Sequence, residues 1–157
     1  MRMDGIPPVD NPEVLQQPPR IVVDTNVVMG GLINPVKASG RVVNLWLGGK
    51  FDVLVSPALR EEYLHTFSRM RFGSKEAVDR RERVLGRLLH NENLICIEPG
   101  FKLSVIRDDP SDNRLLECAV AGKAAYIVSQ DRHLLRIGEY DGVVILTAHA
   151  FLEREKF

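Results

Sequence analysis

Residues 20 to 28 have the sequence RIVVDTNVV, an aliphatic run interrupted by Asp24, Thr25 and Asn26. The run predicts a buried strand over residues 21–28 with a polar end. Strands that are apolar along their whole length are typical of parallel sheets covered by helices on both faces. This stretch therefore indicates an α/β fold and places an acid near the end of its first strand.

The rest of the chain alternates between strand-like and helix-like patterns. Four more strands are expected at residues 51–55, 94–97, 125–128 and 143–146, and helices at residues 39–47, 56–71, 74–90, 112–121, 132–137 and 148–155. Ser56-Pro57 and Ser74 are helix-starting signals. Strands separated by helices predict a three-layer α/β/α sandwich around a central, mainly parallel five-stranded sheet.

Length and composition describe one domain. The chain has 157 residues, 45% of them hydrophobic, which suffices for a full core. Residues 1–19 hold five of the nine prolines, so we expect a flexible or partly extended tail and assign the domain to residues 20–157. No apolar run approaches the roughly 18 residues of a membrane span, and no secretion signal is visible. The two cysteines match no zinc or disulfide pattern, so we expect both to be buried in a cytoplasmic protein.

Four acids occupy equivalent positions in the predicted αβ units. Asp24 and Asp131 follow strands, Asp112 opens a helix, and Glu62 lies in the helix after the second strand. The carboxyl ends of parallel strands meet at one edge of the sheet, where such folds bind ligands. Four carboxylates in one dry crevice would repel one another unless a cation neutralised them. The sequence therefore predicts a site for a hard divalent ion.

Each acid also has an ordinary structural explanation. Asp24 and Asp112 are common residues at turns and helix starts. Glu62 competes with Glu61, and we prefer Glu62 because it lies beside the apolar stripe of its helix. Asp109 is expected to shape the turn before the next helix. The histidines show no metal-ligand spacing and are expected in surface or capping roles; they are His65, His90, His133 and His149.

The segment from Thr66 to His90 is locally basic, although the chain has 21 basic and 21 acidic residues and no net charge. That segment contains seven Lys or Arg residues and three Asp or Glu residues. About half of these charges are expected in ion pairs on solvated helix faces. A basic ridge beside an acidic crevice nevertheless suits a polyanionic substrate. The candidate RNA-binding residues are Arg69, Arg71, Lys75, Arg80 and Arg81.

Four motifs, taken together, resemble the PIN-domain family, and most closely its VapC-related toxin–antitoxin branch. They are Val23-Asp24-Thr25-Asn26-Val27, Ser56-Pro57 with Glu62, Asp109-Pro110-Ser111-Asp112-Asn113, and the stretch VSQDRHLL at residues 128–135. The resemblance covers about residues 20–150. It implies a parallel sheet sandwiched by helices and a Mg²⁺- or Mn²⁺-dependent ribonuclease. Gln130 departs from the family pattern, which often has Gly there.

The resemblance also implies roles for individual residues. The implied acidic quartet and its polar supports are Asp24, Glu62, Asp112 and Asp131, with Asn26 and Ser129. Our hypothesis is that Asp24 and Asp112 hold the principal ion and that the other two acids complete the site. A metal-activated water would attack the phosphodiester in line, with a second ion ~4 Å away when substrate arrives. The implied partners are RNA, a cognate antitoxin that occludes the crevice, and a second copy of the chain.

Two other functions stay open at this point. A phosphohydrolase of small phosphoesters would need a second acid soon after an aspartyl nucleophile, and Asp24-Thr25-Asn26 lacks it. A catalytically silent PIN-like module that binds RNA or protein would tolerate loss of the acids, whereas this chain keeps all four. Metal-dependent cleavage of RNA, but not of small phosphoesters, separates the three functions.

Overall fold

The structure is a computed structural model that describes residues 17–107 and 109–157. The strands are β1 (Arg20–Val23), β2 (Asp52–Val55), β3 (Leu94–Cys96), β4 (Tyr126–Val128), β5 (Glu139–Tyr140) and β6 (Val143–Leu146). The helices are α2 (Thr25–Ile33), α3 (Ala38–Leu47), α4 (Pro57–Ser68), α5 (Lys75–Leu89), α6 (Pro110–Ala121), α7 (Arg132–Ile137) and α8 (Ala148–Glu155). The predicted tail lies almost entirely outside the described residues.

The central sheet has six strands in the order β3-β2-β1-β4-β6-β5. All neighbours pair in parallel except β5 and β6, which are antiparallel. The α/β class and the mainly parallel sheet are confirmed, but the expected number of five strands is wrong. The sixth strand, β5, consists of two residues, Glu139 and Tyr140, which is too short to produce an alternating pattern.

The first strand is shorter than the sequence predicts. It ends at Val23, and residues from Thr25 onward form α2. Val27 and Val28 are fully buried on that helix, so their apolar character reflects helix packing and not a continued strand. A short apolar run cannot by itself distinguish the two structures. The consequence is that Asp24 is the N-cap residue of a helix at the carboxyl end of a strand.

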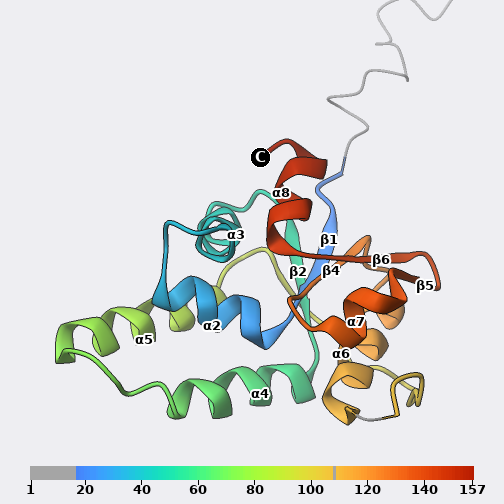
Figure 1. The fold of residues 1–157 in the computed structure, drawn as a ribbon, viewed down its shortest axis with the longest axis horizontal. Coiled ribbons are helices and arrows are strands. Elements are labelled where there is room, and N and C mark those ends of the chain that lie inside the picture. Colours follow the sequence, from blue (N-terminus) through green and yellow to red (C-terminus); the bar gives the residue numbers. More distant parts are fainter. Residues whose placement is uncertain (1–16, 108) are drawn as a thin grey trace, which may run out of the picture.

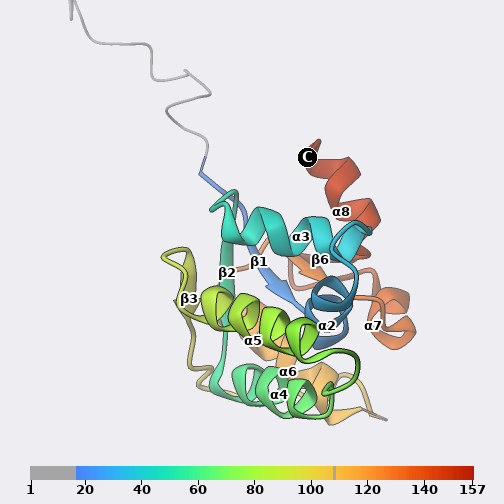
Figure 2. The same cartoon turned by 90° about the vertical axis from the view of Figure 1, so that its left-hand side faces the viewer.

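Helices cover both faces of the sheet. In Figure 1, α2, α3 and α5 lie on one side of the strands and α6 on the other, and Figure 2 shows the same arrangement from the side of α5. Helix α6 packs against β1, β2 and β4. Helices α2 and α3 approach closely: a methyl group added at Gly31 of α2 would lie 2.7 Å from the Ser39 carbonyl oxygen of α3. The three predicted layers are therefore present.

The carboxyl edge of the sheet carries polar residues, whereas the α8 side is closed by aromatic side chains. The ring of Phe151 lies 5.5 Å from that of Phe51 and 5.4 Å from that of Tyr126, measured between centroids. Cys118 is buried as expected, but Cys96 is exposed, because β3 is an edge strand. Among the described residues, no helix has both the length and the apolar character needed to cross a membrane.

Candidate metal centre

The four predicted acids line one cavity of about 280 Å³ at the carboxyl edge of the sheet. They come from four separate elements: the start of α2, the middle of α4, the first turn of α6 and the residue before α7. The predicted convergence is therefore what the fold produces. The complete lining is Asp24, Thr25, Asn26, Met29, Glu62, Thr66, Asp109, Ser111, Asp112 and Asp131.

Asp24 is held by Ser129, the residue after β4. Although Asp24 is the N-cap residue of α2, its side chain makes no capping bond. Instead its Oδ2 accepts a hydrogen bond of 2.6 Å from the Ser129 hydroxyl. Ser129 is fully buried, and its Oγ also accepts from the backbone N–H of Asp131 at 3.0 Å. One buried hydroxyl thus fixes two of the four acids relative to each other, the supporting position expected for Ser129.

Glu62 is positioned by two contacts of α4 with the end of β1. The Thr25 hydroxyl donates to Glu62 Oε2 at 2.5 Å. The buried Tyr63, next in the chain, donates its hydroxyl to the backbone carbonyl of Val23. These contacts turn Glu62 toward Asp24, while Glu61 is exposed and does not line the cavity. The preference for Glu62 over Glu61 agrees with this geometry. Thr25 is a contact that the sequence analysis did not identify.

Asp112 contributes an oxygen that has no hydrogen-bond partner among the residues that the structure describes. Its side chain is only 3% exposed, and Oδ2 is buried without a hydrogen bond. Asp109 is the N-cap residue of α6 and accepts from Ser111 N–H at 3.0 Å, so it shapes this turn as expected. An unpaired buried carboxylate oxygen is costly, which marks Asp112 as the residue most in need of a cation.

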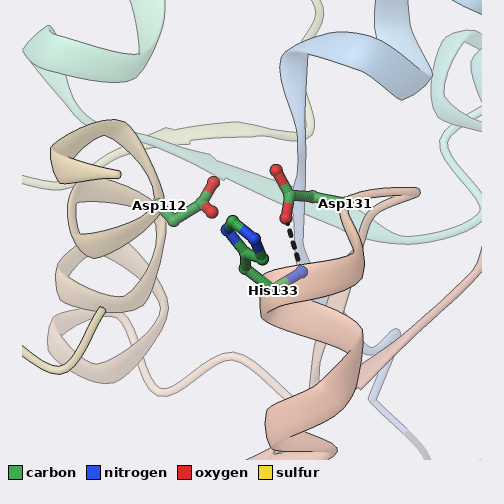
Figure 3. Close-up of side chains that lie close together, drawn as sticks. All are labelled: Asp112, Asp131 and His133. Atoms are coloured by element: carbon green, nitrogen blue, oxygen red, sulfur yellow. Dashed lines mark hydrogen bonds between the residues drawn. The ribbon is translucent and has the colours of Figure 1, made fainter. Parts of the chain in front are cut away.

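Asp131 and His133 lie opposite Asp112. Asp131 is the N-cap residue of α7, and its Oδ1 accepts from the backbone N–H of His133 at 2.7 Å. Figure 3 shows the Asp112 and Asp131 carboxylates facing each other with the His133 imidazole beside them. One ligand atom from each of the three residues lies within 4.8 Å of the other two. Sequence spacing had favoured surface or capping roles for His133. His133 is indeed exposed and is not among the residues that line the cavity, but its ring lies beside the Asp112 and Asp131 carboxylates.

The electrostatics of the cavity follow from burial and from mutual repulsion. Burial raises the pKa of Asp24 to about 6, opposed by the Ser129 hydrogen bond and assisted by the Glu62 carboxylate. Burial also raises the pKa of Asp112 to about 7, with added repulsion from Asp109 and Asp131. Without a cation, both acids therefore ionise at a higher pH than an ordinary Asp does. Together, the carboxylate donors and the unpartnered Asp112 oxygen fit a divalent ion that prefers oxygen ligands.

The predicted RNA-binding set needs one correction. Arg81 is only 7% exposed, and its guanidinium donates to the Phe72 carbonyl at 2.8 Å and lies over the Phe72 ring. It stabilises the turn between α4 and α5 and is not available to a substrate. Arg80 is partly engaged, because it donates to the Leu32 carbonyl at 3.0 Å. The exposed candidates are Arg69, Arg71 and Lys75, the last paired with Asp79 at 2.9 Å.

A sequence profile described as "PIN domain" matches residues 20–133. The chain belongs to the PIN-domain family. It is also similar to an uncharacterized protein of Methanocaldococcus jannaschii, with 27% identity over 119 residues, which cover 75% of this chain and 74% of the relative. The region matched by the PIN-domain profile includes all four acids of the cavity. PIN domains are generally nucleases, and membership of the family supports a ribonuclease-type enzyme.

Two solved structures resemble this fold at low sequence identity. VapBC2 from Rickettsia felis, bound to a DNA fragment from the promoter of its genes, has a TM-score of 0.53 and 14% identity, covering 80% of this chain and 96% of that chain. The T. brucei RRP44 PIN domain has a TM-score of 0.47 and 11% identity, covering 89% and 82%. The first of these shows that the two chains share a fold.

Proposed function

We propose that this PIN domain is a divalent-metal-dependent endoribonuclease that hydrolyses RNA phosphodiesters. The observation that carries the proposal is the convergence of four acids in one cavity, where Asp112 Oδ2 is buried and has no partner among the described residues. A structural cluster of this kind would be expected to pair its buried oxygens internally. A site for a divalent cation explains both the convergence and the missing partner.

Each residue has a distinct part in this proposal. Asp24 and Asp112 would hold the principal Mg²⁺ or Mn²⁺ ion, and Glu62 and Asp131 would complete the site directly or through water. When bound, the ion supplies an acidified water and offsets charge on the leaving oxygen. Ser129 holds Asp24 and Asp131 in position relative to each other through its two hydrogen bonds. The supporting roles of Asn26, exposed beside the cavity, and Ser129 are part of the same proposal.

The exposed basic residues lie at the end of α4 and in the segment that leads to the start of α5. Thr66 lines the cavity, and Arg69 follows it by one helical turn. A second hollow of about 650 Å³ shares Glu62 and Ser111 with the acidic cavity and is bordered by His65 and Arg114. We propose that RNA lies across this surface with its backbone near Arg69, Arg71 and Lys75 and its scissile phosphate at the acids.

A cleavage assay on the full chain tests the proposal. Purified protein is incubated with Mn²⁺ or Mg²⁺ and with single-stranded RNA, structured RNA, DNA and a small phosphoester. We expect cleavage of RNA only, lost on chelation. Asp24→Asn and Glu62→Gln should each reduce the rate by about a hundredfold or more, since each loses a metal-site carboxylate.

Glu61→Gln is the matched control, because it removes the neighbouring acid from the same helix, where it borders the second hollow but not the acidic cavity. Circular dichroism verifies that all variants fold. Equal loss in Glu61→Gln and Glu62→Gln would contradict the assigned site. Binding of RNA without cleavage, under conditions in which the metal is bound, would favour the catalytically silent PIN-like module. Cleavage of the small phosphoester alone would indicate a phosphohydrolase.

We further propose that the enzyme works in the cytoplasm as the toxin of a type II toxin–antitoxin pair, with a cognate antitoxin as partner and a homodimer as its assembled form. Support comes from the shared fold with the VapBC2 complex of Rickettsia felis. Expression of the chain alone should arrest bacterial growth, and Asp24→Asn should not. Co-expression of the adjacent gene product should restore growth and copurify with the chain. Unimpaired growth with active wild-type enzyme would contradict the toxin role.

A further inference from the structure

A nitrogen donor, His133, lies beside the cavity between α6 and α7. Asp112 comes from the first turn of α6, whereas Asp131 and His133 come from the start of α7. Their ligand atoms all lie within 4.8 Å of one another. His133 is exposed, and its imidazole lies next to both carboxylates in Figure 3. Three donors from two elements can thus reach one ion after small side-chain movements.

Hydrogen bonding within the cavity points to the same cluster. Asp24 Oδ2 is bonded to Ser129, and Glu62 Oε2 is bonded to Thr25. Asp112 Oδ2, by contrast, is buried without a partner in the described parts of the chain, residues 17–107 and 109–157. The backbone N–H of His133 donates to Asp131 Oδ1, which holds this carboxylate in place at the start of α7. The cluster therefore has an orphaned oxygen and a preorganised neighbour, which an acidic surface patch would lack.

Ligand chemistry distinguishes which ion such a cluster prefers. Mg²⁺ requires oxygen ligands in near-ideal octahedral geometry and gives up its waters reluctantly. Imidazole nitrogen suits first-row transition ions, whose affinity for mixed nitrogen and oxygen sites exceeds that of Mg²⁺. We propose that His133 is a direct ligand of the divalent ion, together with Asp112 and Asp131, and that the site therefore favours Mn²⁺ over Mg²⁺. This inference rests on the proposed function and refines its choice of metal.

Electron paramagnetic resonance of the full chain with Mn²⁺ alone tests the ligand directly. Spin-echo modulation detects ¹⁴N nuclei bound to Mn²⁺, so wild-type protein should show nitrogen coupling and His133→Gln should lose it. The affinity for Mn²⁺ should fall by about tenfold or more in His133→Gln, because one ligand is lost. The affinity for Mg²⁺, measured by competition, should change much less.

His65→Gln is the matched control, since His65 lies in the adjoining hollow near Glu62. It should retain the nitrogen coupling. Absence of coupling in wild-type protein with bound Mn²⁺, or its persistence in His133→Gln, would overturn the assignment, as would failure to bind Mn²⁺. RNA cleavage measured on the same samples separates the two proposals. RNA cleavage without nitrogen coupling would overturn only the assignment of His133 as a ligand. Nitrogen coupling without RNA cleavage would overturn only the proposed nuclease activity.

Discussion

At the scale of single residues, the cavity combines features that oppose folding when no ion is bound. Asp112 is buried with an unpaired oxygen, and Asp24 is buried beside Glu62. Both acids are protonated more readily in the folded chain than in the unfolded chain. The site therefore lowers the free energy of unfolding of the metal-free protein. A bound ion should stabilise the fold as well as serve catalysis.

The metal-free protein should lose stability as the pH rises. The folded-state pKa values of about 6 for Asp24 and about 7 for Asp112 lie above the unfolded value near 4. The folded state therefore binds more protons, and its free energy of unfolding falls between about pH 4 and pH 7. Asp112→Asn removes one of these charges and should stabilise the metal-free protein at pH 8 by about 1 kcal/mol or more.

Thermal unfolding in chelator at pH 5 and pH 8 measures this effect. For a chain of this size, each kcal/mol of stabilisation by Asp112→Asn should raise the Tm by about 2–4 °C. Asp141→Asn, in an exposed turn between β5 and β6, is the control and should leave the difference between the two pH values unchanged. Added Mn²⁺ should raise the Tm of wild-type protein but hardly that of Asp112→Asn. A lower Tm for Asp112→Asn at pH 8 in chelator would contradict the argument.

At the scale of elements, the sequence predicts most helices and parallel strands because their signals are local. Ser56 and Ser74 cap α4 and α5 by accepting from the N–H three residues later. The boundary at Asp24 is mispredicted, since Val27 and Val28 continue the apolar run that precedes it. Burial on both faces of a strand and burial inside a helix give the same residue types, and only tertiary packing separates them.

The close approach of α3 to the loop that precedes it gives a prediction at this scale. A Cβ at Gly40 would lie 2.3 Å from backbone atoms of Pro35, whereas nothing lies within 4 Å of one at Gly86 in α5. Gly40→Ala should therefore destabilise the protein by about 1–3 kcal/mol. Gly86→Ala should stabilise it by about 0.4–1 kcal/mol through helix propensity and unfolded-state entropy. Urea unfolding of both variants measures the two effects, and equal changes would contradict the packing.

At the scale of the whole molecule, strand order brings together acids that lie more than 100 residues apart in the sequence. The parallel pairing of β1 with β4 and β2 places the ends that carry Asp24, Asp131 and α4 at one edge. This much follows from pattern alone. His133 and Thr25 could not be assigned in advance, because their contacts depend on side-chain directions at the helix starts. Arg81 was misassigned because a charge pattern does not reveal which basic residue packs inward.

The charge distribution predicts how salt affects RNA binding. Net charge is zero, so binding should depend on the exposed basic residues near the cavity. In the non-cleaving Asp24→Asn background, adding Arg69→Gln and Arg71→Gln should weaken binding and lower the slope of log affinity against log salt by about 1.4 for single-stranded RNA. Lys50→Gln with Lys123→Gln, before β2 and β4 at the opposite edge, is the control of equal charge. An equal decrease of this slope in both double variants would contradict the proposed RNA path.

Anomalous scattering from crystals containing Mn²⁺ tests most directly whether the four converging acids form a metal centre. We predict a strong peak within coordinating distance of the Asp24 and Asp112 carboxylates, and its loss in Asp112→Asn crystals of the same form. A solvent-accessible cavity with no peak, in crystals soaked at saturating Mn²⁺, would contradict the account.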